Sequence, residues 1–196
     1  MASSTICGKI SANQVINCNQ PLQSGTEDTL ILINWEDWLG GAITLNGVDD
    51  QIVENIILGT GLTGFEMQGK NNSNAPQFEM VKQEYTEMWQ HEVNYKVFNV
   101  NAAAKKQMRL KSKGRFVAII YNKYKGLAGD SAFEIYGGDS GLIVTQMKRV
   151  VNDTPTQGAF DIILKTDEKS LEPFPPKQLY KTDYATTKAI AESLIP

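Results

Sequence analysis

The chain has very few of the residues that hold most protein-bound zinc ions. Its 196 residues include one histidine, His91, and two cysteines, Cys7 and Cys18. Two thiols near the N-terminus and one distant imidazole cannot complete a tetrahedral His/Cys zinc site within one chain. The sequence favours two reduced thiols in an intracellular protein, and the alternative is a disulfide that closes a small N-terminal loop.

Excess basic charge and long apolar runs are also absent. The formal net charge is −3, whereas a surface that grips nucleic-acid phosphates is normally basic. This balance argues against a dedicated phosphate-binding surface, but it does not exclude a nucleic acid that passes nearby without being held. No window contains the roughly 18 uninterrupted apolar residues of a membrane span, and residues 1–11 contain no apolar run of signal-peptide length. We therefore expect neither a membrane partner nor export by a signal peptide.

What the chain does contain is a succession of short β-like segments. Hydrophobic residues make up 41% of the composition and charged residues 21%, which suits one domain with a substantial core. The clearest strand is Met88–Phe98, where apolar and polar side chains alternate. Apolar and β-branched runs predict further strands at Glu27–Asn34, Ala42–Leu45, Ile52–Leu58, Leu62–Gln68, Arg115–Tyr121, Ser131–Tyr136, Leu142–Met147 and Phe160–Lys165.

Helical signals are fewer. Asn101 suits the N-cap of a helix over Ala102–Ser112, which consists of helix-forming residues. Near the C-terminus, Leu171–Pro176 is too rich in proline to join a central strand. After it, Asp183 can cap a short helix over Tyr184–Leu194.

These patterns predict an α+β, β-rich fold class: an antiparallel β-sandwich or barrel with one flanking helix and extended terminal arms. The core domain is expected over residues 27–168. Residues 1–26 are predicted to form an N-terminal arm, and residues 169–196 a C-terminal arm with a short helix that reaches beyond the core.

The stretch Gly138–Gly141 reads Gly-Asp-Ser-Gly, the four letters around the nucleophile of chymotrypsin-like serine proteases. His91 precedes Ser140 in the chain, so a serine hydrolase that uses Ser140 and His91 is one alternative. Against it, His91 lies in the middle of a predicted strand, and the motif continues with Leu142 where those proteases have glycine and proline. The favoured interpretation is a hairpin turn over Gly137–Gly141, in which the glycines matter more than the serine.

No other motif predicts a site. Gly59–Gly64 fits the G-x-G-x-x-G pattern, but a strand-like segment follows it in place of a helix that could hold a pyrophosphate. Three acidic pairs suit solvated turns and strand ends better than cation sites: Glu27/Asp28, Glu36/Asp37 and Asp49/Asp50. We therefore predict no catalytic, cofactor-binding or metal-binding residues, no cofactor and no enzymatic activity.

Several segments, spread over most of the chain, resemble major tail tube proteins from bacteriophages of Bacteroidota. The resembling segments are Gly25–Asn34, Val93–Asn99 together with the Ala/Lys helix after it, Gly114–Gly126, Ala132–Leu142, Asn152–Phe160 and Lys181–Ile190.

The resemblance implies a β-sandwich or barrel with a flanking helix, a long loop and terminal arms that contact neighbouring subunits. It also implies stacked hexameric rings, a homo-oligomeric tube through which DNA leaves the capsid without specific binding. The partners would be other virion tail proteins, and the location the virion tail, assembled in the host-cell cytoplasm. Another virion ring protein, such as a connector or tail terminator, is the near alternative.

Overall fold

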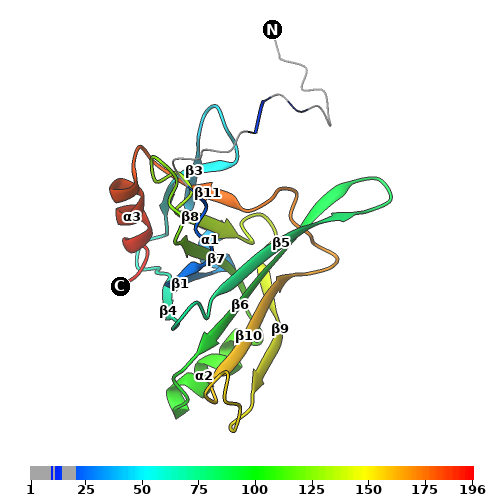
Figure 1. Cartoon of the computed structure of the whole chain (residues 1–196), viewed down its shortest axis with the longest axis vertical. Helices are drawn as coiled ribbons and strands as arrows, with labels where there is room; N and C mark the ends of the chain where they lie inside the picture. Colours follow the sequence, from blue (N-terminus) through cyan, green and yellow to red (C-terminus); the bar gives the residue numbers. More distant parts are fainter. Residues whose placement is uncertain (1–9, 11, 15–20) are drawn as a thin grey trace.

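The computed structural model describes residues 10, 12–14 and 21–196 (Figure 1). Most of the predicted N-terminal arm, residues 1–26, lies outside the described residues. Cys7 and Cys18 also lie outside them, so the redox state of the two thiols stays a prediction.

The described residues form eleven strands and three helices. The helices are Trp35–Leu39 (α1), Ala102–Lys111 (α2) and Tyr184–Glu192 (α3). The strands are Thr26–Asn34 (β1), Ala42–Leu45 (β2), Ile52–Ile57 (β3), Phe65–Gln68 (β4), Ala75–Lys82 (β5), Glu87–Val97 (β6), Arg115–Asn122 (β7), Phe133–Tyr136 (β8), Leu142–Arg149 (β9), Phe160–Thr166 (β10) and Lys177–Leu179 (β11).

Strands β1 and β7 form the centre of the fold. They pair antiparallel, with Ile31 opposite Ile119 and Leu32 opposite Ala118. Successive side chains on a strand point to opposite faces, and on these two strands both faces are buried. This explains why both sequences read as continuous apolar runs and not as alternating ones.

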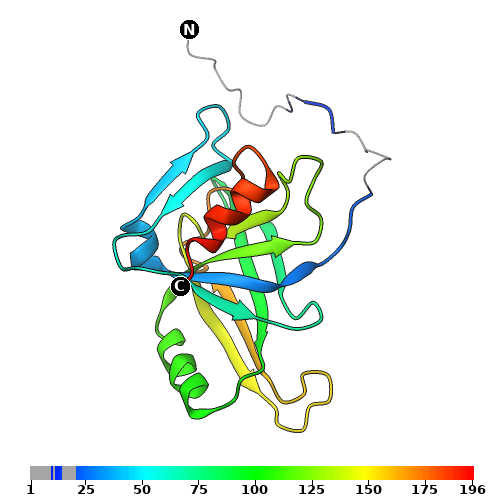
Figure 2. The same ribbon diagram turned by 90° about the vertical axis from the view of Figure 1, so that its left-hand side faces the viewer.

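Each face of the β1–β7 pair supports a separate hydrophobic cluster. One cluster combines Ile31 and Ile119 with side chains from β3, β8, β11, α1 and α3. The other combines Leu32 and Ala118 with side chains from β6, β9, β10 and α2. The sheet has the strand order β2-β3-β11-β8-β7-β9-β10-β6-β5. The strands β9, β10 and β6, which follow β7 in this order, supply most of the side chains that cover the second face. Helices α3 and α2 lie toward opposite ends of the molecule (Figure 2).

The predicted β-rich α+β, sandwich-like fold class is confirmed. One strand pair is parallel, β11 with β3, so the sheet is mixed where an antiparallel one was predicted. The helix predicted over Ala102–Ser112 is also confirmed, as α2. Its predicted N-cap is present, since Asn101 Oδ1 accepts a hydrogen bond of 2.8 Å from the Ala104 N–H. This cap satisfies one of the free N–H groups at the start of α2.

The C-terminal segment differs from the prediction. Residues 169–196 were expected to reach beyond the core, but β11 pairs with both β3 and β8, and α3 packs on the first cluster. Thr187, Ala191 and Leu194 are buried. Thr187 and Ala191 lie about one turn apart on one face of α3, and Leu194 follows the end of the helix. A second helix therefore flanks the sheet.

Strand β5 is the longest of three elements that the sequence did not predict, and the others are strand β11 and helix α1. It pairs with β6 along its whole length, from Ala75 opposite Asn94 to Lys82 opposite Glu87. Most of its side chains are exposed, so burial imposes no apolar alternation on its sequence. The pairing with β6, a tertiary contact, is what makes this segment a strand.

The packing of α3 leads to a stability prediction. Replacing buried Ala191 by Gln forces a large polar side chain into the first cluster and should lower the free energy of unfolding by about 2 kcal/mol or more. The same substitution at Ala189, which is exposed on the same helix, should change it by about 0.5 kcal/mol or less. Urea unfolding of both variants measures the difference. Equal, small effects would mean that α3 does not pack on the core.

Candidate functional site

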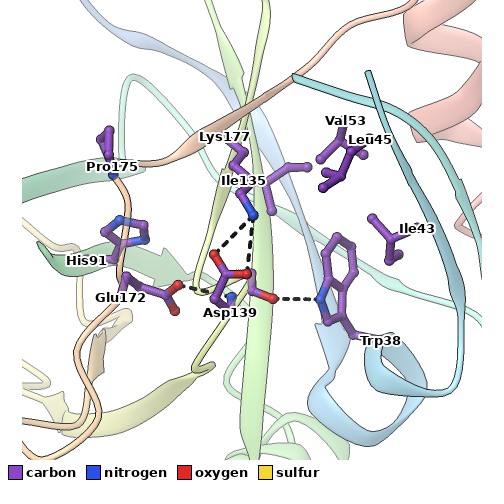
Figure 3. Close-up of a pocket in the computed structure, with 11 residues that line it drawn as sticks. Trp38, Ile43, Leu45, Val53, His91, Ile135, Asp139, Glu172, Pro175 and Lys177 are labelled. Atoms are coloured by element: carbon purple, nitrogen blue, oxygen red, sulfur yellow. Dashed lines mark hydrogen bonds and ion pairs between the residues drawn. The ribbon is translucent and has the colours of Figure 1, made fainter. Parts of the chain in front are cut away.

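The residues that resemble a serine-protease motif lie beside a cavity of about 220 Å³ (Figure 3). The cavity lies between the segment Gly137–Gly141, the segment after β10, and the β2–β3 hairpin. Its walls are Trp38, Ile43, Leu45, Val53, His91, Ile135, Gly138, Asp139, Glu172, Pro175 and Lys177.

The prediction that Gly137–Gly141 forms a hairpin turn is wrong. Strands β8 and β9 both pair antiparallel with β7 and continue in the same direction along it. Tyr136 lies opposite Ala118 and Leu142 opposite Phe116, so the five residues 137–141 occupy the space of one residue on β7. The segment, which we call the loop, is therefore a large bulge in one interrupted strand.

The glycines of the loop are required by its backbone. Gly137 and Gly141 both have a φ of 75°, which disfavours residues that carry a Cβ. A Cβ on Gly137 would lie 2.6 Å from Leu142 Cγ, and one on Gly141 would collide with the Arg115 side chain. The Gly141 N–H donates to the Gly137 carbonyl at 3.0 Å, which closes the loop. The emphasis on glycine was correct, although the hairpin geometry was not.

Ser140 is held by three hydrogen bonds. Its Oγ donates to the Leu171 carbonyl at 3.1 Å, its N–H donates to Glu172 Oε1 at 2.8 Å, and its carbonyl accepts from Arg115 at 3.0 Å. None of these contacts is with an imidazole. The hydroxyl fixes the loop to the segment after β10.

His91 lies in the same region, as the hydrolase alternative requires, but both ring nitrogens bind main-chain groups. Nδ1 accepts from the Gly137 N–H at 3.1 Å, so the ring proton is on Nε2, which donates to the Phe174 carbonyl at 3.0 Å. Burial lowers the pKa of His91 to about 4, although the bond to Phe174 opposes this shift. The structure thus brings His91 and the loop together through the Gly137 main chain and does not pair His91 with the Ser140 hydroxyl.

Glu172 is the residue of this site that the sequence did not reveal. Its carboxylate is buried and accepts from the Asp139 N–H at 3.0 Å as well as from the Ser140 N–H. Its own main chain exchanges two hydrogen bonds with Trp89 on β6, at 2.7 and 2.9 Å. Burial raises the pKa of Glu172 to about 7, while the two N–H donors oppose the rise. A glutamate at the start of a proline-rich segment carries no sequence signal for this role.

Two further side chains hold the loop on the side of the β2–β3 hairpin. Trp38 Nε1 donates to the Gly138 carbonyl at 2.9 Å, and Lys177 Nζ lies 3.1 Å from Asp139 Oδ2 (Figure 3). The loop is thus bound from α1, β6, β7, β11 and the segment after β10. Chemically, the arrangement satisfies main-chain polar groups at a break in the sheet.

The remaining sequence motifs gain no site. Strand β4, and not a helix, follows Gly59–Gly64. Within residues 21–196, no three His, Cys, Asp or Glu side chains are grouped so that they could hold a metal ion. The three acidic pairs are among the residues to which this finding applies. No helix in the described part of the chain is long and apolar enough to cross a membrane.

The loop geometry predicts the relative cost of two substitutions. Gly141→Val places a β-branched side chain at positive φ against Arg115 and should lower the free energy of unfolding by at least about 2 kcal/mol. Ser140→Ala removes the hydroxyl bond to Leu171 and should cost about 1 kcal/mol. Chemical denaturation of both variants gives the comparison. A larger cost for Ser140→Ala would contradict this description of the loop.

Glu172 predicts a pH effect on stability. Because its folded pKa, about 7, is above its ordinary value of 4.5, the folded state binds more protons in that range. Ionisation of Glu172 therefore lowers the free energy of unfolding as pH rises from 4.5 to 7, by about 3 kcal/mol.

Glu172→Gln should remove this slope, so the variant gains stability relative to the wild type by that amount across the window. His91 has the opposite effect, since its folded pKa of about 4 is below 6.5 and its contribution is lost as pH falls between these values. It is present in both proteins and cancels in the difference. Urea titrations of both proteins at pH 4.5 and 7.5 measure the difference between their free energies of unfolding. A difference that does not change with pH would contradict the burial of a titrating Glu172.

Comparison of the chain with protein-family models, with curated proteins and with solved structures found no match. No relative therefore supplies a role for His91, Ser140 or Glu172. Their assignment as the groups that hold the loop rests on the contacts described above.

Proposed function

We propose that the protein is a structural virion subunit that self-assembles into stacked hexameric rings, the tail tube of a bacteriophage. DNA would leave the capsid through the tube. The resemblance of segments such as Gly25–Asn34 and Ala132–Leu142 to major tail tube proteins suggests this function. The β-rich sandwich-like fold, which the resemblance also implies, supports it.

The observation that carries self-assembly is the β5–β6 hairpin. Strand β5 is the last strand in the sheet order, so one edge of it is unpaired among the described residues. The hairpin extends from the body of the molecule (Figure 1). Phe78, Met80 and Tyr85 on it are 46%, 55% and 87% exposed. An open strand edge with exposed apolar side chains is a surface on which another chain can pair or pack.

Exposed aliphatic side chains on other loops support contacts with more than one neighbour. Val48 lies between β2 and β3, Leu127 between β7 and β8, and Val151 between β9 and β10, and all three are exposed. A subunit of a stacked tube has neighbours within its own ring and in the rings above and below. Contact points on several loops suit that arrangement.

The charge of the chain suits a DNA conduit. With a net charge of −3, the subunit does not attract phosphates as a nucleic-acid-binding protein does. DNA would pass without specific binding. The proposed location is the virion tail, after assembly in the host-cell cytoplasm, with other tail proteins as further partners.

Two alternatives differ in what they predict. A connector or tail terminator would form rings that do not stack. A serine hydrolase would need the Ser140 hydroxyl beside a base, but this hydroxyl donates to the Leu171 carbonyl and both His91 ring nitrogens bind main-chain groups. The geometry of the site therefore supports neither acyl transfer nor another reaction at Ser140.

Electron microscopy of the purified protein tests the proposal directly. Tubes with a central channel are expected. Single rings that never stack would favour the connector or terminator, and a chain that stays monomeric at high concentration would overturn assembly of either kind.

A paired variant tests the role of the hairpin. Met80→Asp combined with Tyr85→Asp places charge on the exposed apolar surface and should reduce the polymerised fraction at least tenfold in sedimentation. Because both side chains are exposed, the unfolding free energy should change by about 0.5 kcal/mol or less per substitution. The conservative pair Met80→Leu and Tyr85→Phe should assemble normally. Normal assembly of the charged variant would exclude the hairpin from the interface.

A further inference from the structure

A second cavity lies on the other side of Arg115 from the loop's hydrogen-bonded main chain and is distinct from the cavity lined by His91 and Glu172. It has a volume of about 540 Å³ and lies between α2 and strands β1, β4 and β7. Leu32, Phe65, Leu110 and Phe116 contribute apolar walls, and Met67 and Lys111 also line it. This volume is in the range of cavities that hold small organic ligands, and an apolar lining with few polar groups is typical of them.

Lys111 gives this cavity its chemical character. The residue is only 9% exposed, although it carries an ammonium group. Its Nζ donates to the Met67 sulfur at 2.9 Å and to the Tyr95 hydroxyl at 3.4 Å, and lies 5.4 Å from the centre of the Tyr95 ring. A thioether is a weak acceptor, and the phenol is at the limit of hydrogen-bond distance.

No carboxylate compensates this charge. Among the described residues Lys111 takes part in no ion pair. Burial lowers the pKa of Lys111 to about 8, so the amine still carries a proton in most molecules at pH 7. Buried charges in proteins are normally paired or fully hydrogen-bonded. The Tyr95 ring offers only partial compensation.

The other charged groups at the cavity limit what could pair with Lys111. Glu36, Glu66 and the last residue of the chain, Pro196, also line it, but all three are exposed, so their negative charges are solvated. They disfavour a ligand with a second negative group. Arg115, a further lining residue, already donates to the Ser140 carbonyl. The complementary molecule therefore has one anionic head and an apolar body.

We propose that this cavity binds a monocarboxylate with an aliphatic chain, whose carboxylate pairs with the Lys111 ammonium and whose chain contacts Leu32, Leu110 and Phe116. A carboxylate supplies the strong acceptor that Met67 and Tyr95 do not, and it forms a short, charge-assisted hydrogen bond with an ammonium. The chain removes apolar surface from water within a cavity that already exists. This site is independent of the tube-forming surface on the β5–β6 hairpin.

Octanoate is a suitable probe, with octanol as its uncharged counterpart. Isothermal titration calorimetry at pH 7 on the full chain should detect octanoate binding to the wild type. Lys111→Met keeps the length of the side chain and removes its charge, and it should weaken octanoate binding about tenfold or more. Octanol should bind Lys111→Met at least as well as it binds the wild type. The control variant Lys106→Met, exposed on the same helix, should bind octanoate like the wild type.

Thermal unfolding separates a lost ligand contact from a damaged fold. Without octanoate, Lys111→Met should melt no lower than the wild type, because an unpaired buried charge is replaced by an apolar side chain of similar shape. Octanoate should raise the melting temperature of the wild type and not that of Lys111→Met. Equal octanoate binding by both proteins, no binding by the wild type, or equal affinity for octanol and octanoate would overturn the proposal.

Discussion

The antiparallel pairing of β1 with β7 is the constraint on which the rest of the structure depends. Both strands are buried on both faces, so their alternate side chains must be covered from two sides. Helix α3 and strands β3, β8 and β11 cover one face, and β6, β9 and β10 cover the other. The C-terminal segment supplies part of the cover on the first face, through Leu179, Ala191 and Leu194. This explains why residues 169–196 pack on the sheet and do not extend away from it.

The loop 137–141 is a consequence of this double coverage. Strand β8 belongs mainly to the first cluster, whereas β9 leads to the strands that cover the second, and both run along the same edge of β7. The bulge between them leaves main-chain groups without sheet partners. His91, Glu172 and Trp38 each bind one or more of those groups. Buried polar side chains are stable here because the main chain satisfies them.

The buried ionisable groups fall into two kinds, according to whether main-chain groups bind them. His91 and Glu172 are bound by main-chain groups, and this accounts for their position in the core. Lys111 has only a sulfur and a distant phenol, beside an apolar cavity. The unpaired edge of β5 is a similar case at the surface, where main-chain groups and apolar side chains face solvent. Local interactions are incomplete at both of these places, and at both we infer binding.

The sequence by itself determined the β-rich fold class, the central strands and the helix after Asn101. Apolar runs, period-two alternation and a capping residue are local signals of local structure. It also indicated that the glycines around Ser140 outweigh the serine, since backbone conformations with positive φ favour glycine wherever they occur. Only the tertiary structure decided that β5 is a strand, that the loop is a bulge and that Glu172 binds it. Each of these depends on a partner far away in the chain, and a contact between distant residues leaves no pattern within either segment.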